Sequence, residues 1–464
     1  MTEAKGDLEA ERTGKIEEIE EKQPIHLSWR ESLGRVFQNR NFKIFLATAW
    51  IYSSMQVTNR YFTLYFRDIG VSYVAVGMLF SAMTIVALGG TFIAGYLADN
   101  YDRKRLAYVT MGINALGFLI LSAAIDLWMV AFGLLTLAAS NFTGQGGTAY
   151  IMEVIDRRHG GVAVSLFTLG TLLGLVPLLV VSIMLDARWV FVDVMRVMFF
   201  ASGVLYIACT IIRMIWLDAT PVPVRERSGS ILRDVISENL RGLKLLVRVF
   251  PIFIAVMILD ALSDSFYGFS NLYYVNETLN FGIGDINLML LLTLIISVPL
   301  TLYLGSVFDK RGGKRLTIGV YSVMPIAITL LIIAQIFPYL APLEWVNALN
   351  SVYPGLGVIF SLAFIATAIK SINDVLWMSV IRTYIQKSLP RKELGKMLGL
   401  TTVLIILTGT VAPILSGIIY QLYQGVPLLV MALILNIFIL AVLVTKSIEP
   451  RISVEELENG DEAV

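Results

Sequence analysis

Long apolar runs separated by short polar segments make up most of this 464-residue chain. An α-helix rises about 1.5 Å per residue, so a run of about 18 or more residues can cross a hydrocarbon core of roughly 30 Å. Backbone groups inside lipid must be hydrogen-bonded internally, so we expect these runs to be helical even where they contain Gly or Pro. The pattern predicts about twelve spans, near residues 42–66, 73–98, 106–125, 128–153, 161–185, 190–215, 249–274, 286–308, 316–337, 355–383, 397–421 and 425–445.

Composition supports a membrane protein and excludes several other classes. Hydrophobic residues make up 56% of the chain and charged residues only 15%, against roughly 25% charged in soluble domains. A net charge of +1 without a basic face argues against a nucleic-acid partner. Cys209 is the single cysteine, and His26 and His159 lie outside the apolar runs. With no phosphate-loop pattern and no nucleophile–base set, we expect no enzyme activity, no cofactor and no metal site.

The distribution of Lys and Arg predicts the orientation. If the N-terminus is cytosolic, all of the 36 basic residues lie in cytosolic segments or helix ends except Arg60, Arg67, Arg188, Arg196 and Lys370. We therefore expect a multi-pass protein of the cell membrane with both termini cytoplasmic. Arg213 is interpreted as a flanking charge at a cytosolic helix end.

The same pattern predicts five regions of the chain. They are an acidic cytosolic tail with an amphipathic helix (1–41), a six-helix bundle (42–217), a cytosolic linker (218–248), a second six-helix bundle (249–445) and an acidic tail (446–464). A fully solvated segment is the alternative for residues 1–41.

A charged segment between the second and third spans has a second copy in the chain. The first copy reads AGYLADNYDRKRL (94–106), and LGSVFDKRGGKRL (304–316) lies between spans eight and nine. Gly95 and Gly305 occupy corresponding positions in these two segments. A motif repeated at the same place in two six-span halves indicates an internally duplicated transporter fold.

These loops resemble the signature inner loop of the major facilitator superfamily, and the resemblance extends over all twelve spans. Asn100 and Asp102 depart from that pattern, because they replace a basic residue and a glycine. The resemblance implies an all-α membrane protein of twelve transmembrane helices in two pseudo-symmetric halves.

The resemblance also implies a cytosolic gate, in which Asp99 faces the start of span eleven and Arg103 pairs with Glu153 or Asp156. Such contacts would hold the two halves together on the cytosolic side. A simple topology anchor is the alternative. The expected gate residues are Gly95, Asp99, Arg103, Lys104, Glu153, Asp156, Gly305, Asp309, Lys314 and Arg382.

Four predicted spans carry polar residues at helical spacing: the first and fourth of each half. Each set is expected to lie along one helical face, and the resemblance implies that these faces line a central cavity. Ionisable residues inside a span are functional candidates because they are costly there. A static ion-pair network is the alternative. The candidate solute and proton residues are Asn59, Arg60, Asn141, Gln145, Asp260, Asp264, Lys370, Asn373, Asp374 and Trp377.

Together these features predict a monomeric secondary transporter that moves a small organic solute by alternating access, coupled to H⁺, with membrane lipid as its surroundings. Drug or metabolite efflux is one reading. However, Phe142 replaces the arginine that antiporters of this superfamily carry, and Pro177 is displaced by two positions from their proline. Facilitated or ion-coupled uptake of a metabolite is the alternative. A non-transporting receptor or scaffold is the alternative from another class.

Overall fold

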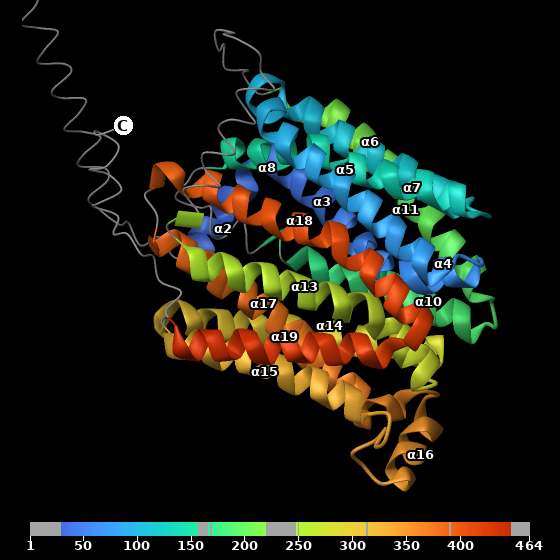
Figure 1. Ribbon diagram of the computed structural model, residues 1–464. Coiled ribbons are helices and arrows are strands. Elements are labelled where there is room, and N and C mark those ends of the chain that lie inside the picture. Colours follow the sequence, from blue (N-terminus) through green and yellow to red (C-terminus); the bar gives the residue numbers. More distant parts are fainter. Residues whose placement is uncertain are drawn as a thin grey trace, which may run out of the picture.

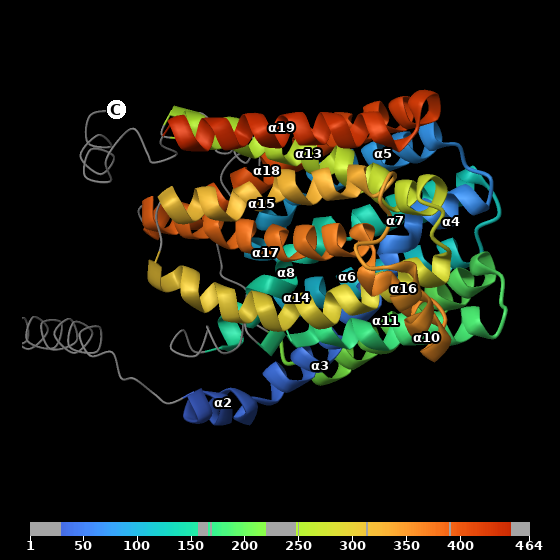
Figure 2. The same ribbon diagram turned by 90° about the horizontal axis from the view of Figure 1, so that it is seen from below.

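The computed structural model describes residues 29–155, 166–167, 169–219, 247–248, 250–311, 314–388 and 391–446. Within these ranges the chain is helical apart from turns and one isolated bridge between Tyr339 and Ser361. The long helices run side by side in a single bundle (Figures 1 and 2).

The N-terminal half of the bundle comprises α2 (Trp29–Gln38), α3 (Arg40–Met55), η1 (Gln56–Tyr61), α4 (Phe62–Asp68), α5 (Tyr73–Asn100), α6 (Arg103–Ser122), α7 (Leu127–Ala139), α8 (Asn141–Val154), η3 (Gly170–Gly174), α10 (Leu175–Asp186) and α11 (Phe191–Trp216). The C-terminal half comprises α13 (Pro251–Tyr273), the π-helical turn η4 (Tyr274–Thr278), α14 (Ile283–Arg311), α15 (Lys314–Ile333), α16 (Leu343–Val352), η5 (Leu356–Phe360), α17 (Leu362–Ser388), α18 (Arg391–Tyr423) and α19 (Gly425–Thr445).

Two ends of the bundle are distinguished below. The α2 end is where α3 begins and α5 ends, and the α4 end is where α4 ends and α5 begins (Figure 2). Short polar side chains start helices at these ends, as their capping preference predicts. Ser72 accepts a hydrogen bond from the Ala75 N–H at the start of α5, and Asp126 accepts one from Met129 at the start of α7.

The helices follow the predicted apolar runs but are less regular than expected. Residues Gln56–Tyr61 form a 3₁₀ segment that divides the first predicted span into α3 and α4, and Ser140 separates α7 from α8. The cavity candidates Asn59 and Arg60 therefore lie in a 3₁₀ segment rather than in an α-helix. The helix α16 was not predicted, because only ten residues form it.

Length and composition identify membrane-spanning candidates among the described helices. Seven of them are long and apolar enough to cross a membrane, and three shorter apolar helices accompany them. Large apolar side chains also cover the outside of the bundle, for example Trp128, Ile183 and Phe438, as lipid-facing residues do. The count of twelve spans and the cytosolic position of the termini stay predictions.

The two halves contact each other through α5 against α18 and α10 against α14. Glycine permits the first contact, because a Cβ atom added to Gly77 would lie 2.3 Å from the Pro413 carbonyl oxygen. A Cβ on Gly417 would lie 2.5 Å from the Tyr73 carbonyl oxygen. Such close backbone approach is typical of helix pairs inside membranes.

Candidate functional site

Lys370 of α17 is the centre of a charged cluster in the C-terminal half. Its side chain is 4% exposed, and its ammonium lies 2.8 Å from Oδ1 of Asp264 on α13. It also forms an ion pair with Asp374, one turn further along α17, and lies 5.1 Å from the centre of the Tyr267 ring. A buried ammonium is costly unless it is paired, and here two carboxylates surround it. Lys370, Asp264, Asp374 and Tyr267 are called the Lys370 cluster below.

A third acid, Asp260, lies one turn from Asp264 and has different partners. Trp377 of α17 donates its indole N–H to Asp260 Oδ2 at 2.7 Å, and the Tyr321 hydroxyl of α15 lies 2.8 Å from Oδ1. The same hydroxyl lies 2.7 Å from Oδ1 of Asn436 on α19. Asp260 is buried, so its charge state depends on these few neighbours.

Arg60 links the N-terminal half to this region electrostatically. It lies in η1 and is exposed, and its positive charge is near enough to act on Asp374 electrostatically, although no ion pair joins the two among the described residues. Neighbouring Asn59 donates a hydrogen bond to Gln56 within the 3₁₀ segment. Two buried amide atoms, Asn59 Oδ1 and Asn373 Nδ2, have no hydrogen-bond partner among the described residues. Unpaired buried polar atoms of this kind are available to a bound solute.

Two predicted cavity residues do not join the cluster. Asn141 donates to the Ala138 carbonyl within its own half, and its residue is exposed. Gln145 is exposed as well, and no side-chain contact joins it to the Lys370 cluster within the described ranges. Helical spacing placed these residues on one face of α8, but it carried no information about which neighbour that face meets.

Part of the predicted gate can be described. Arg103 Nη1 lies 2.8 Å from Glu153 Oε2, which is one of the two pairings expected from the resemblance. Arg103 also donates to the Ala98 carbonyl, and Lys104 is the second residue of α6. Lys314 is the exposed first residue of α15. Asp156 and the side chains of Gly95, Asp99, Gly305, Asp309 and Arg382 lie outside the described part.

Polar contacts join the two halves at the α4 end. Glu277 of η4 lies 2.9 Å from Arg67 Nη1 of α4, and its Oε1 accepts a 2.8 Å hydrogen bond from the Tyr73 hydroxyl of α5. Its other oxygen accepts a hydrogen bond from Tyr420 of α18, at 3.0 Å. Tyr273 donates to the Thr63 carbonyl across the same boundary.

A second set of contacts joins the halves near the same end. The Tyr61 hydroxyl donates to Asn287 of α14, and Asn287 donates to the Leu178 carbonyl of α10. Tyr353 donates to Asp186 at 2.8 Å.

Sequence reasoning missed several of these residues. Glu277 is an isolated acid in a polar stretch near a predicted outer helix end, and Asn436 is an isolated amide in an otherwise apolar span. Either residue could have been noticed because its polar side chain stands alone in its part of the sequence. Tyr321 carried no such signal, because a tyrosine in an apolar span is more often a packing residue.

Paired halves of long apolar helices, joined at one end and enclosing buried charges, define a membrane transporter of the two-bundle class. A family model described as the Major Facilitator Superfamily matches residues 44–373. The chain belongs to the major facilitator superfamily.

Several solved structures share this fold. The nucleoside transporter NupG has a TM-score of 0.62 at 14% identity, covering 88% of this chain and 99% of that chain. The inward-open xylose transporter XylE from E. coli has a TM-score of 0.59 at 14% identity, covering 91% and 99%. The human organic anion transporter MFSD10 has a TM-score of 0.55 at 12% identity, covering 87% and 99%. No curated protein matches the chain. At such identities these structures show a shared fold alone.

Proposed function

We propose that the protein is a secondary active transporter of a small organic solute, works by alternating access, and couples that cycle to protons through Asp260. The observation that carries this proposal is the buried ammonium of Lys370, which pairs with two partly exposed acids, Asp264 of α13 and Asp374 of α17. A network that only held the two helices together would not need a third acid, Asp260, that is buried and has separate partners.

The hydrogen bonds around the Tyr321 hydroxyl support a protonated Asp260 in this conformation. A tyrosine hydroxyl carries one proton, yet it lies within hydrogen-bond distance of both Asp260 Oδ1 and Asn436 Oδ1. The amide of Asn436 is oriented by its Nδ2, which donates to the Ala432 carbonyl at 2.8 Å. If Tyr321 donates to Asn436, its oxygen must accept a hydrogen bond from Asp260. That bond requires a proton on the carboxyl group.

The charge balance agrees with this assignment. With Asp260 neutral, the ammonium of Lys370 and the guanidinium of Arg60 balance the carboxylates of Asp264 and Asp374. Loss of the Asp260 proton would leave one uncompensated negative charge in a buried region, which is costly. We infer that this charge is accommodated by a change of conformation, so proton release and movement of the two halves are coupled.

The contacts at the α4 end support one side of an alternating-access cycle. They join the halves where the predicted topology places the outer membrane surface, so this conformation is closed to the outside. Arg103 and Glu153 already pair in this conformation and both lie in the N-terminal half, so in the opposite state other contacts at the α2 end would join the halves. Under this proposal both termini are cytoplasmic and the protein resides in the cell membrane as a monomer.

We infer the class of solute from solved structures that share the fold. Solved structures with this fold include transporters named for nucleosides and xylose, a human organic anion transporter, and a POT family transporter in complex with 5-aminolevulinic acid. The cluster here offers charges of both signs, which suits a zwitterion such as 5-aminolevulinic acid best. Efflux driven by inward proton flow and proton-coupled uptake are both compatible with it.

Uptake into proteoliposomes tests the proposal. Radiolabelled uridine, xylose, 5-aminolevulinic acid and benzoate are offered with and without an imposed pH gradient. We expect at least one solute to accumulate only with the gradient. Asp260→Asn imitates the protonated acid, so this variant should exchange solute across the membrane but lose gradient-driven accumulation. Lys370→Gln should lose both activities, because it leaves two carboxylates unpaired.

Asp193→Asn is the matched control, since Asp193 is an exposed acid paired 3.7 Å from Arg196 within the N-terminal half. It should behave as the wild type does. Gradient-driven accumulation that persists unchanged in Asp260→Asn would contradict the coupling role of this residue. A wild-type protein that moves none of the four solutes under either condition would contradict the proposed transport.

Accumulation without any proton gradient but with a sodium gradient would favour the alternative, ion-coupled uptake. Equilibration without any gradient would favour facilitated transport.

A further inference from the structure

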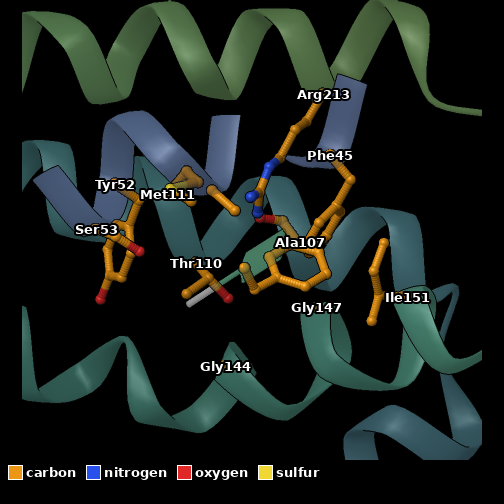
Figure 3. A pocket seen from close by; sticks show the side chains of 12 residues that line it. Phe45, Tyr52, Ser53, Ala107, Thr110, Met111, Gly144, Gly147, Ile151 and Arg213 are labelled. Atoms are coloured by element: carbon orange, nitrogen blue, oxygen red, sulfur yellow. The ribbon is translucent and has the colours of Figure 1, made fainter. Parts of the chain in front are cut away.

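A cavity lies within the N-terminal half, between α3, α6, α8 and α11 (Figure 3). Its volume of about 400 Å³ is within the range of small-molecule sites, which is roughly 300–1,000 Å³. Most of its lining is apolar, including Phe45, Met111 and Phe167, and Arg213 supplies the cationic group. None of these residues belongs to the Lys370 cluster.

Arg213 lies in the last turn of α11, as expected of a flanking charge, but its side chain is buried inside the N-terminal half. The residue is 3% exposed, and its side chain extends from α11 towards Ala107 and Phe45 (Figure 3). Nε donates to the Thr48 hydroxyl at 2.9 Å, and Nη1 donates to the Ala107 carbonyl at 3.1 Å. The guanidinium carbon lies 4.1 Å from the centre of the Phe45 ring.

All of these partners are electrically neutral. Among the residues that the structure describes, no carboxylate forms an ion pair with Arg213 and Nη2 donates no hydrogen bond. A buried charge without a counter-charge is costly, and two neutral acceptors and one aromatic ring offset only part of that cost. An anion that enters the cavity would remove the imbalance.

We propose that this cavity binds a carboxylate-bearing amphiphile, whose carboxylate contacts Arg213 and whose apolar body lies against Phe45, Met111 and Phe167. Guanidinium groups bind planar carboxylates with two parallel hydrogen bonds, which makes them suited to this anion. The amphiphile can come from the bilayer as a fatty acid or from water as an aromatic acid. This site is separate from the proposed proton coupling, so either proposal can fail without the other.

Direct binding tests the proposal without requiring transport. Purified protein in nanodiscs of zwitterionic phosphatidylcholine is titrated by calorimetry with naphthalene-2-carboxylate and with naphthalene-2-carboxamide, its neutral counterpart. We expect the carboxylate to bind at least tenfold more tightly than the carboxamide. Arg213→Gln should remove that preference, and Arg213→Lys should retain part of it. Decanoate as a competitor separates the two sources, since displacement of the carboxylate indicates that a bilayer fatty acid shares the site.

Arg196→Gln is the matched control. Arg196 lies on the same helix, donates to the Ala124 carbonyl at 3.2 Å and is more exposed, so its loss should leave the carboxylate preference unchanged. If Arg213→Gln does not fold, Gly144→Leu provides an independent test, because a Cβ atom added to Gly144 meets nothing within 4 Å. The leucine would extend into the cavity and should abolish binding while the protein stays folded.

Two results would overturn the proposal. One is equal affinity of the wild-type protein for the carboxylate and the carboxamide, including the absence of binding by both. The other is an unchanged carboxylate affinity in folded Gly144→Leu protein.

Discussion

Replacing Glu277 by glutamine should open the α4 end of the bundle. Glu277 is the C-terminal-half residue that contacts both Arg67 and Tyr73 of the N-terminal half, at 2.9 and 2.8 Å. Glutamine keeps the size of the side chain but removes its charge. The closed conformation should therefore lose contacts that the open conformation lacks, and the population of the open conformation should rise.

The magnitude follows from the exposure of each partner. Arg67 and Glu277 are 38% and 19% exposed, so their ion pair contributes no more than about 1 kcal/mol. Changing the acceptor of the Tyr73 hydrogen bond from a carboxylate to an amide costs about 1 kcal/mol more. The bond from Tyr420 lies within the C-terminal half and is unaffected by opening. A total of about 2 kcal/mol corresponds to roughly a 30-fold change in the ratio of open to closed protein.

Double electron–electron resonance spectroscopy between two spin labels measures the ratio of open to closed protein. Cys209, the only native cysteine, is buried, so introduced cysteines can be labelled selectively. Ile125→Cys and Ile336→Cys place one label at the α4 end of each half, since both residues are exposed there. Glu277→Gln should increase the fraction of long distances. A higher salt concentration should also increase the fraction of long distances, but by less, because salt screens the partly exposed ion pair between Arg67 and Glu277.

Asp193→Asn serves as the control, because it removes an acid from the α4 end without touching the boundary between the halves. A distance distribution in Glu277→Gln that equals that of the wild type would refute the reasoning. It would mean that apolar packing of α5 against α18 alone keeps this end closed.

Two further predictions concern contacts near the same end. Gly77→Ala should lower the thermal unfolding temperature in detergent and cost about 1–3 kcal/mol of stability, because its Cβ would lie 2.3 Å from the Pro413 carbonyl oxygen. Gly268→Ala is the control and should be tolerated, because nothing lies within 4 Å of a Cβ at that position. Equal effects of the two changes would contradict this steric argument. The hydrogen bond to Asp186 raises the pKa of Tyr353 above its usual 10.0, so that bond should stabilise the closed end at neutral pH and be lost as the pH rises through the raised value. An ultraviolet difference titration should show one tyrosine ionising at lower pH in Asp186→Asn, and identical titration curves would rule out the contact in solution.

The sequence predicted the family and the general position of the helices well. The apolar runs required helices because a lipid environment leaves no other way to satisfy the backbone. The duplicated segments at 94–106 and 304–316 indicated the superfamily, which the family match confirms. The sequence also grouped Asp264, Lys370 and Asp374 as cavity candidates, with a static ion-pair network as the alternative, and in the structure Lys370 pairs with both acids.

Other parts of the site could not be derived from spacing. A helical period assigns residues to faces of one helix, but it does not fix how neighbouring helices rotate or which faces meet. The sequence named Asp260 as a cavity candidate, but it did not show that Tyr321 of α15 and Trp377 of α17 are its partners. It also did not show that Asn436 of α19 contacts the same Tyr321 hydroxyl. The 3₁₀ turn that carries Arg60 was likewise invisible, because its composition does not differ from that of an α-helix.

By itself, then, the amino-acid sequence determined a helical, membrane-embedded chain of the major facilitator superfamily, since hydrophobic length and a repeated charged loop are local properties of the chain. Only the tertiary structure decided which charges pair. It joined Glu277 to Arg67 and Tyr73 across the two halves, and it buried Arg213 beside a cavity without a described counter-charge. Those outcomes depend on packing between helices that are distant in sequence, where a rotation of one helix replaces one set of neighbours by another.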